Sequence, residues 1–385
     1  MGIDASAMLI AKKHGYENYV SSLLSALTGL GEELGDLELV FYFHAGNPLA
    51  DRQLLSTILP AFTRYRCRVY PYGRLFGLFL PLIARIDRLK LLHLPVYAWR
   101  GGFHCPVLVT VHDTCGARLS STPGKSTTMA LGQHHRQTTR LLRLSSAVVT
   151  VSHSVRRDLE TFYDYPAKEV AVVYHGIDEF FFPDNDAAGQ VQSKYDLSQA
   201  YILVVNAVQV RKNHRRLLQA YQWLLADTSV DVQLVLVGRR GPGSRAIVRD
   251  IECFEPAGAV RYLDYVRREE LRGLYTGAKL VVNPSLCEGF GLPLLEAMAC
   301  GTPLAVSDAT SFPEVAGDAA AYFDPYDVGD MAHTIHAALT DERLRTELKE
   351  AGKKRVAEFS WRRSATQMAE IYRRLGQRSI DGSEY

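Results

Sequence analysis

The chain has 385 residues, of which 47% are hydrophobic and 22% are charged, and its formal net charge is +2. These proportions are those of a folded globular protein, and they exclude a disordered chain, a collagen-like repeat and a small disulfide-stapled scaffold. The length predicts two or three domains of about 150 residues each. No apolar run reaches the ~18 residues that a membrane-spanning helix needs, and no signal peptide is evident, so we expect a cytoplasmic protein.

Short apolar runs alternate with amphipathic stretches along most of the chain. In the first half the candidate strands are 39–43, 107–111, 147–151 and 170–174. In the second half they are 201–205, 232–237, 280–283 and 303–306. Near-continuous apolar strands separated by helices are typical of parallel sheets covered on both faces. Two such sets predict two doubly wound α/β domains.

The polar stretch 183–193, PDNDAAGQVQS, has the composition of a linker. We therefore expect an N-terminal domain over residues 1–188 and a C-terminal domain over 194–359. A last segment, 360–376, is predicted to be a helix that starts after Ser360 as its N-cap.

Positive charge is concentrated in the N-terminal half. Residues 52–143 contain 14 Lys and Arg against 2 Asp, a net charge of +12 in a chain that is nearly neutral overall. A block of this kind favours an anionic partner. Within it, basic residues flank the apolar stretch 75–84, which suits a helix lying in the interface of an anionic membrane; a buried helix with solvated ends is the alternative. We expect no nucleic acid, because no zinc finger, RNP or basic-zipper pattern is present.

The most informative segment is 280–303, LVVNPSLCEGFGLPLLEAMACGTP. A strand ends near Asn283, a glycine-rich loop follows, and Pro293 is suited to the start of a helix that Gly301 would end. Glycines and a free helix N-terminus make an anion site suited to a diphosphate. Glu288 and Glu296 frame this loop, where carboxylates can accept hydrogen bonds from sugar hydroxyls. The alternatives are a simple tight turn and a first-turn acid that complements the helix dipole.

Two other predicted strands end in residues suited to the same ligand. Arg211 and Lys212 follow the strand 201–205 in the sequence NAVQVRKN, where they could neutralise a departing diphosphate. His112 ends the strand 107–111, with Asp113 placed to orient its ring. A solvated Arg211 and a satisfied core His112 are the alternatives. The cysteines show no zinc spacing, so we expect no metal site.

The run from Leu274 to Asp327 resembles the signature of two glutamates, with seven residues between them, in the retaining glycosyltransferases of family 4. This resemblance implies the GT-B fold, in which two Rossmann-like domains face a central cleft and the last helix crosses back to the first domain. It implies that Glu296 holds the ribose of a nucleotide sugar and Glu288 the sugar itself. Further donor contacts are implied at Asn206, Gly238, Gly289, Phe290, Gly291 and Leu292.

The same resemblance assigns roles to residues outside that run. Lys212 matches a phosphate-binding lysine, and His112 a histidine beside the donor sugar. Gly15 matches a glycine loop over the diphosphate, although His14 replaces the first of its two usual glycines. The family often has an arginine five residues before the lysine; that position is Ala207, and we expect Arg211 to compensate.

The members that this chain resembles include bacterial mannosyltransferases of surface polysaccharide synthesis. We therefore expect a hexose, mannose from GDP-mannose, to be transferred to a glycan or polyprenyl-diphosphate-linked acceptor, with retention and without metal or other cofactor. A UDP-hexose donor, or a non-catalytic subunit of the same fold, are the alternatives. The basic 52–143 region would dock the acceptor-binding domain peripherally on the inner face of the cytoplasmic membrane.

Overall fold

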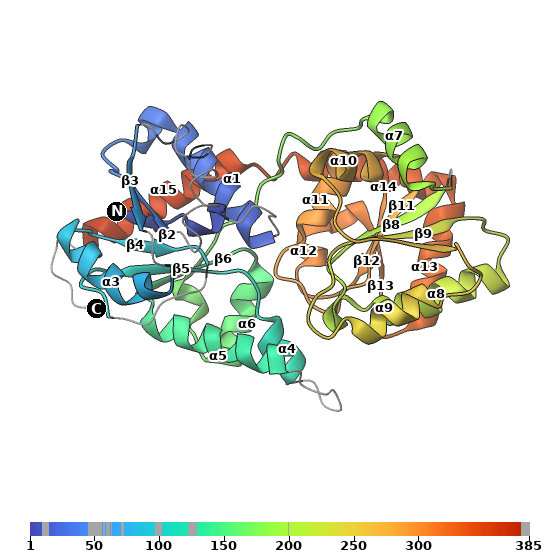
Figure 1. Cartoon of the computed structure of the whole chain (residues 1–385), viewed down its shortest axis with the longest axis horizontal. Helices are drawn as coiled ribbons and strands as arrows, with labels where there is room; N and C mark the ends of the chain where they lie inside the picture. Colours follow the sequence, from blue (N-terminus) through green and yellow to red (C-terminus); the bar gives the residue numbers. More distant parts are fainter. Residues whose placement is uncertain are drawn as a thin grey trace. The chain divides into compact units, whose positions relative to one another are not determined.

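The computed structural model describes residues 1–9, 15–44, 56, 58, 62, 64–70, 73–96, 102–121, 129–198 and 200–378. The chain forms two compact units, one comprising Met1–Gly176 with Ser360–Tyr385 and the other Ile177–Phe359. Figure 1 labels their helices and strands. None of the helices in the described part is long and apolar enough to cross a membrane.

The N-terminal unit is built on a parallel sheet with the strand order β3-β2-β1-β4-β5-β6-β7 among the described residues. Its interior strand β5 (Val107–Val111) is buried along its whole length, as expected for a sheet covered on both faces. The other strands are β1 (Gly2–Asp4), β2 (Val40–His44), β3 (Arg66–Tyr70), β4 (Leu92–Leu94), β6 (Ala147–Thr150) and β7 (Val170–Val172).

Helices pack on this sheet, and the last of them comes from the far end of the chain. They are α1 (Gly15–Gly29), α3 (Gly73–Ile86), α4 (Cys115–Ser120), α5 (Met129–Leu144), α6 (His153–Tyr163) and α15 (Trp361–Arg378). The buried face of α15, which includes Met368 and Tyr372, joins the core that α1 forms with Leu23 and Leu27. In Figure 1, α15 accordingly lies within the N-terminal unit, beside α1.

A buried polar network ties α15 to the sheet. His93 on β4 shares one hydrogen bond of 2.8 Å with the Tyr372 hydroxyl and another of 2.9 Å with the Thr110 hydroxyl on β5. Burial lowers the pKa of His93 to about 3, so the ring is neutral at pH 7. A buried neutral histidine with both nitrogens bonded fixes the position of α15 as well as stabilising it.

The C-terminal unit contains a second parallel sheet, with the order β10-β9-β8-β11-β12-β13. Its strands are β8 (Tyr201–Val205), β9 (Gln233–Val237), β10 (Val260–Leu263), β11 (Leu280–Asn283), β12 (Leu304–Ser307) and β13 (Ala320–Phe323). The helices are α7 (Asn185–Tyr195), α8 (His214–Asp227), α9 (Arg245–Glu252), α10 (Arg268–Gly277), α11 (Leu292–Ala299), α12 (Phe312–Ala316), α13 (Val328–Thr340) and α14 (Glu342–Val356). Both units are therefore doubly wound and Rossmann-like, as the sequence predicts.

The predicted linker over 183–193 is wrong. Asp184 caps α7, accepting a hydrogen bond of 2.9 Å from the Ala187 amide, and Ala188 and Val191 are buried. The segment looks like a linker because its other face is exposed. The chain instead passes from one unit to the other at Gly176–Ile177, so residues 177–188 belong to the C-terminal unit.

The prediction that the arginines before the apolar stretch 75–84 flank a helix is wrong for two of them. Arg66 and Arg68 lie on β3, an edge strand of the described sheet, rather than beside a helix. The Asp87 carboxylate, almost fully buried, binds both arginines. Alternating arginines hide a strand from a search for apolar runs, which is why β3 was missed.

Replacing Tyr372 with Phe should destabilise the N-terminal unit by about 1–3 kcal/mol, because one buried nitrogen of His93 loses its partner. Tyr65→Phe is the control, since the Tyr65 hydroxyl is only partly buried and water can replace its bond to the Thr28 carbonyl. Urea unfolding followed by circular dichroism measures both free energies. Equal losses in the two variants would contradict a structural role for the His93 network.

Candidate functional site

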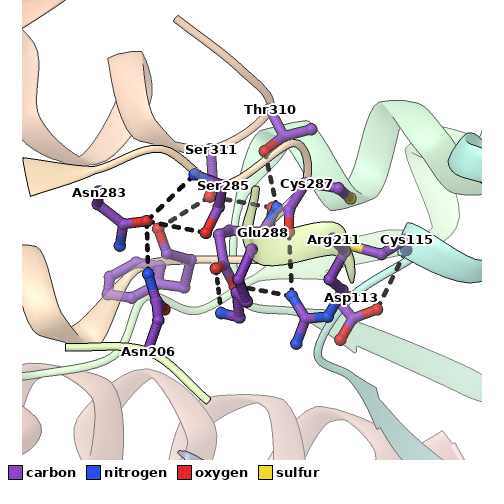
Figure 2. Close-up of polar contacts among 12 residues, drawn as sticks. Asp113, Cys115, Asn206, Arg211, Asn283, Ser285, Cys287, Glu288, Thr310 and Ser311 are labelled. Carbon is purple, nitrogen blue, oxygen red and sulfur yellow. Dashed lines mark hydrogen bonds and ion pairs between the residues drawn. The ribbon is translucent and has the colours of Figure 1, made fainter. Parts of the chain in front are cut away.

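The strand order of the C-terminal sheet reverses between β8 and β11, and ligands of open α/β sheets bind beyond the carboxyl ends of such strands. Asn206 follows β8, and Asn283 is the last residue of β11. The Asn206 side-chain amide donates to Oδ1 of Asn283 over 2.9 Å, and the Ser285 hydroxyl donates to the same oxygen over 2.8 Å (Figure 2). This bonding fixes both strand ends at the point where a ligand is expected.

Arg211 and Lys212 lie in the short 3₁₀ helix Val210–Lys212 and both bind Glu288. Lys212 Nζ donates to one carboxylate oxygen, and Arg211 Nη1 donates to the other over 3.2 Å (Figure 2). Arg211 Nη1 also donates to the Cys287 carbonyl over 3.0 Å. The structure thus brings together three of the predicted site residues, and excludes the interpretation of Arg211 as a merely solvated charge.

The charges of this cluster determine the ionisation of Glu288. Burial alone would raise the pKa of Glu288, but the positive charges of Lys212 and Arg211 outweigh it and hold that pKa below its usual range. The carboxylate is therefore ionised at neutral pH. Two cations and one anion leave a net charge of +1, which can meet an anionic ligand.

The loop after Glu288 is held by two hydroxyls. The Glu288 amide donates to Thr310 Oγ1 over 3.0 Å, and the Ser311 hydroxyl donates to the Phe290 carbonyl over 2.8 Å (Figure 2). Gly289 and Phe290 are buried in this loop.

Gly291 brings the loop to the start of α11, with φ at +116°. A Cβ there would lie 2.9 Å from the Phe312 ring, so glycine is needed for space as well as conformation. Leu292 is the first residue of α11. Among the described residues no acceptor bonds the amides of Gly291 and Leu292, and such amides at a helix start can bind an anion.

Glu296 lies in the second turn of α11, not in the first as predicted, so the interpretation of Glu296 as a first-turn acid is wrong. Its Oε2 accepts a hydrogen bond of 2.7 Å from the Tyr275 hydroxyl. Burial raises the pKa of Glu296 to about 7, even though the Tyr275 bond opposes that rise.

Gly238 comes directly after β9 and supports Asn206 by packing. Its φ is +148°, and a Cβ would lie 2.0 Å from the Asn206 carbonyl oxygen. Any other residue would push the two strand ends apart. Contact of Gly238 with a nucleotide stays a prediction.

His112 of the N-terminal unit is buried directly after β5, against the rings of Tyr16 and Tyr19 at 4.8 and 4.6 Å. Its Nε2 lies 2.7 Å from the Pro95 carbonyl oxygen, which only accepts, so Nε2 carries the proton. Burial lowers the pKa of His112 to about 4, and Nδ1 is bonded to none of the described residues. His112 is therefore a neutral ring whose Nδ1 is a buried acceptor without a bond among the described residues.

Asp113 does not orient the His112 ring as we expected. Its carboxylate instead accepts from the Tyr16 hydroxyl over 2.8 Å and from the Cys115 amide over 3.1 Å. Gly15 is the first residue of α1, and a Cβ would meet nothing within 4 Å, so packing does not explain this glycine. His14, the other residue of the predicted glycine loop, lies outside the described residues.

Sequence reasoning missed Tyr275, Asn283, Ser285, Thr310 and Ser311. Asn283 carried a usable signal, because it ends an apolar strand next to the glycine-rich loop. Tyr275, Thr310 and Ser311 carried none, since their partners lie 21 or 22 residues away along the chain. In the described part of the chain, no group of three or more His, Cys, Asp or Glu could hold a metal ion.

Two family models match this chain. Residues 14–179 match the model described as Glycosyltransferase Family 4, and residues 189–355 match Glycosyl transferases group 1. The matches fall on the N-terminal and C-terminal units respectively.

A curated relative and two solved structures show the same likeness. O-antigen chain mannosyltransferase B of Escherichia coli is 37% identical over 230 residues, 59% of this chain and 60% of that protein. Sucrose-phosphate synthase from Thermosynechococcus elongatus aligns with a TM-score of 0.73 and 20% identity, over 97% of this chain and 98% of that one. Anabaena Alr3699/HepE in complex with UDP and glucose aligns with a TM-score of 0.70 and 17% identity, over the same shares.

The match to O-antigen chain mannosyltransferase B covers 60% of that protein, which is less than two thirds, so it does not establish that this chain has the same activity. The structures, at their low identity, show the fold alone. With both units matched by family models and the whole chain aligned to GT-B structures, the chain belongs to the family 4 glycosyltransferases of the GT-B fold.

Proposed function

We propose that this protein is a retaining hexosyltransferase that moves mannose from GDP-mannose to a glycan or lipid-linked glycan in cell-surface polysaccharide synthesis. The observation that carries the proposal is the cluster of Arg211, Lys212 and Glu288 at the switch point of the C-terminal sheet. It presents a net positive charge beside the free amides at the start of α11, which suits a sugar diphosphate. Mannose is supported by the name of the curated relative.

The chemistry assigned to these residues is transfer on one face of the sugar. The bond from the anomeric carbon to the diphosphate oxygen breaks, and a bond to the acceptor oxygen forms on the same face. The acceptor proton passes to a phosphate oxygen, so no side-chain base is required. Lys212, Arg211 and the amides of Gly291 and Leu292 stabilise the departing diphosphate.

The remaining residues bind and orient the donor. Glu296 accepts hydrogen bonds from the ribose hydroxyls and Glu288 from the sugar. His112 Nδ1 accepts a hydrogen bond from a hydroxyl of the sugar, and Gly15 gives the backbone close access to the diphosphate. Gly238, Gly289 and Phe290 complete the donor contacts. Because cations of the chain supply the positive charge, we propose that no metal or other cofactor takes part.

A UDP-hexose donor is the second candidate, supported by the structural likeness to a protein solved with UDP and glucose. A non-catalytic subunit of the same fold is the third, supported by Ala207 in place of the usual arginine. Nucleotide binding distinguishes the three.

GDP or UDP should raise the melting temperature of the protein, because a ligand at about 100 times its Kd stabilises the folded state by about 2.7 kcal/mol. A GDP-selective rise that is lost in Glu296→Ala would support mannosyl transfer and the proposed site. A UDP-selective rise would move the donor to the second candidate. No rise with either nucleotide would favour the non-catalytic subunit.

His112→Ala should abolish transfer while leaving nucleotide binding within about threefold of the wild type, since a lost positioning bond acts on the reacting sugar. Transfer is measured with radiolabelled GDP-mannose in EDTA, and binding by calorimetry with GDP. Tyr16→Phe, a change in the ring that packs against His112, is the control for altered packing around that histidine. Full activity of His112→Ala would contradict the role given to Nδ1.

We also propose that the basic 52–143 region holds the protein peripherally on the inner face of the cytoplasmic membrane, near a polyprenyl-diphosphate-linked acceptor. The support comes from α3. Leu80 and Ala84 face the core, whereas Phe79, Leu82 and Ile86 are exposed by 54%, 56% and 67%. The last three positions share one helix face, and exposed Arg85 and Arg88 lie close by. An apolar face flanked by arginines suits an anionic bilayer surface.

Vesicles containing anionic lipid should float this protein at low salt and release most of it at high salt, because the attraction between exposed charges is screened. Replacing Leu82 and Ile86 together with Gln should weaken flotation at least about tenfold, since the variant loses two apolar side chains that the bilayer would bury. Tyr326→Gln, an exposed aromatic of the other unit, is the control. An absence of flotation at low salt would reject the membrane proposal.

A further inference from the structure

The segment 177–184, with which the chain enters the C-terminal unit, is held against α10 by arginines stacked on aromatic rings. The Arg268 guanidinium lies over the Phe180 ring at 4.4 Å, and the Arg272 guanidinium over the Phe182 ring at 4.3 Å. Both arginines also bind carboxylates of the segment, Arg268 that of Asp178 and Arg272 that of Asp184. The first residues of the unit are therefore fixed to α10 by charge as well as by packing.

The same helix α10 carries Tyr275, which is fully buried and donates its hydroxyl to Glu296 over 2.7 Å. The Phe181 ring meets the Tyr275 ring nearly edge-on, with centroids 6.0 Å apart. Segment 177–184 thus touches the side chain that orients the predicted ribose-binding carboxylate.

We propose that Tyr275, Arg268 and Asp178 are positioning residues for Glu296, and that their contacts with Phe181 and with one another link segment 177–184 to nucleotide binding. The inference rests on the proposed function, in which ionised Glu296 accepts hydrogen bonds from the ribose hydroxyls. Tyr275 donates to Oε2 of Glu296, and no hydrogen bond joins Oε1 to another described residue, which leaves that oxygen as an acceptor for a ligand hydroxyl in the proposed function.

The groups near Glu296 act on its charge in opposite directions. Its burial raises the pKa of Glu296 to about 7; the Tyr275 hydrogen bond and the Arg268 charge lower it, and the Asp178 charge raises it. Burial also raises the pKa of the nearby Cys300 thiol to about 12, so this thiol adds no charge at neutral pH. Nucleotide affinity should accordingly be high above about pH 7 and fall below it, as Glu296 takes up a proton.

Variants of the three positioning residues should move this midpoint in predictable directions. Asp178→Asn leaves the Arg268 charge unopposed and should lower the midpoint. Arg268→Gln leaves Asp178 unopposed and should raise it, as should Tyr275→Phe by removing the hydrogen bond. The side chains of Arg268 and Asp178 are 48% and 37% exposed, so high salt should shrink their two shifts but not that of Tyr275→Phe.

The experiment is calorimetric titration of the full chain with GDP, and separately with UDP. It covers about pH 5.5 to about pH 8.5, a range that spans the ordinary pKa of histidine and therefore brackets the raised pKa of Glu296. Glu296→Gln is the matched control, because its side chain cannot titrate. Any pH dependence left in that variant belongs to groups other than Glu296, such as the nucleotide phosphates, and is subtracted. Melting curves of each variant at every pH establish that it is folded.

Opposite shifts in Asp178→Asn and Arg268→Gln are the expected result, and packing changes alone do not produce opposite signs. Equal midpoints in the wild type and all three variants would overturn the inference while leaving the donor site intact. A pH dependence in Glu296→Gln equal to that of the wild type would do the same. Absence of binding by both nucleotides at every pH would overturn the donor site, and this inference with it.

Discussion

The largely buried pairing of Glu288 with Arg211 and Lys212 is the interaction on which the candidate site depends. Removing three charged groups from water is costly unless each is paired and hydrogen-bonded, and here both carboxylate oxygens and the Arg211 guanidinium have partners. The pairing joins the residues after β8 to the loop after β11. It therefore fixes the position of positive charge at the switch point before any ligand is bound, which is the preorganisation that charge stabilisation in catalysis needs.

The two carboxylates of the C-terminal unit are in different environments, and this separates their tasks. Glu288 is held ionised by two cations, whereas the direct partner of Glu296 among the described residues is the Tyr275 phenol, and burial raises the pKa of Glu296 to about 7. Glu288 is thus a constant charge, and Glu296 is one that responds to its neighbours. The difference arises because the cations of the 3₁₀ helix at 210–212 outweigh the burial of Glu288, whereas at Glu296 burial outweighs the opposing effect of Tyr275 and Arg268 on α10.

The N-terminal unit depends on buried histidines kept neutral. His93 fastens α15 to the sheet through Tyr372, and His112 keeps one ring nitrogen bonded to the Pro95 carbonyl. In both rings burial favours the uncharged form, so one nitrogen donates and the other accepts. The Pro95 carbonyl makes Nε2 the donor in His112, whereas the two hydroxyl partners of His93 accommodate either tautomer. These bonds connect residues up to 279 positions apart, so no local pattern in the sequence indicates them.

The two parallel-sheet units could be predicted from the amino-acid pattern alone, because fully buried strands such as β5, β8 and β11 are continuous apolar runs. Glu288, Glu296, Lys212 and His112 could be picked out as candidates, because each follows a strand end or a glycine-rich turn. The boundary between the units became evident from the three-dimensional contacts, since polar α7 buries just one face. The pairing of Glu288 with two cations and of Glu296 with Tyr275 became evident in the same way, because those contacts depend on which strands and helices become neighbours in space.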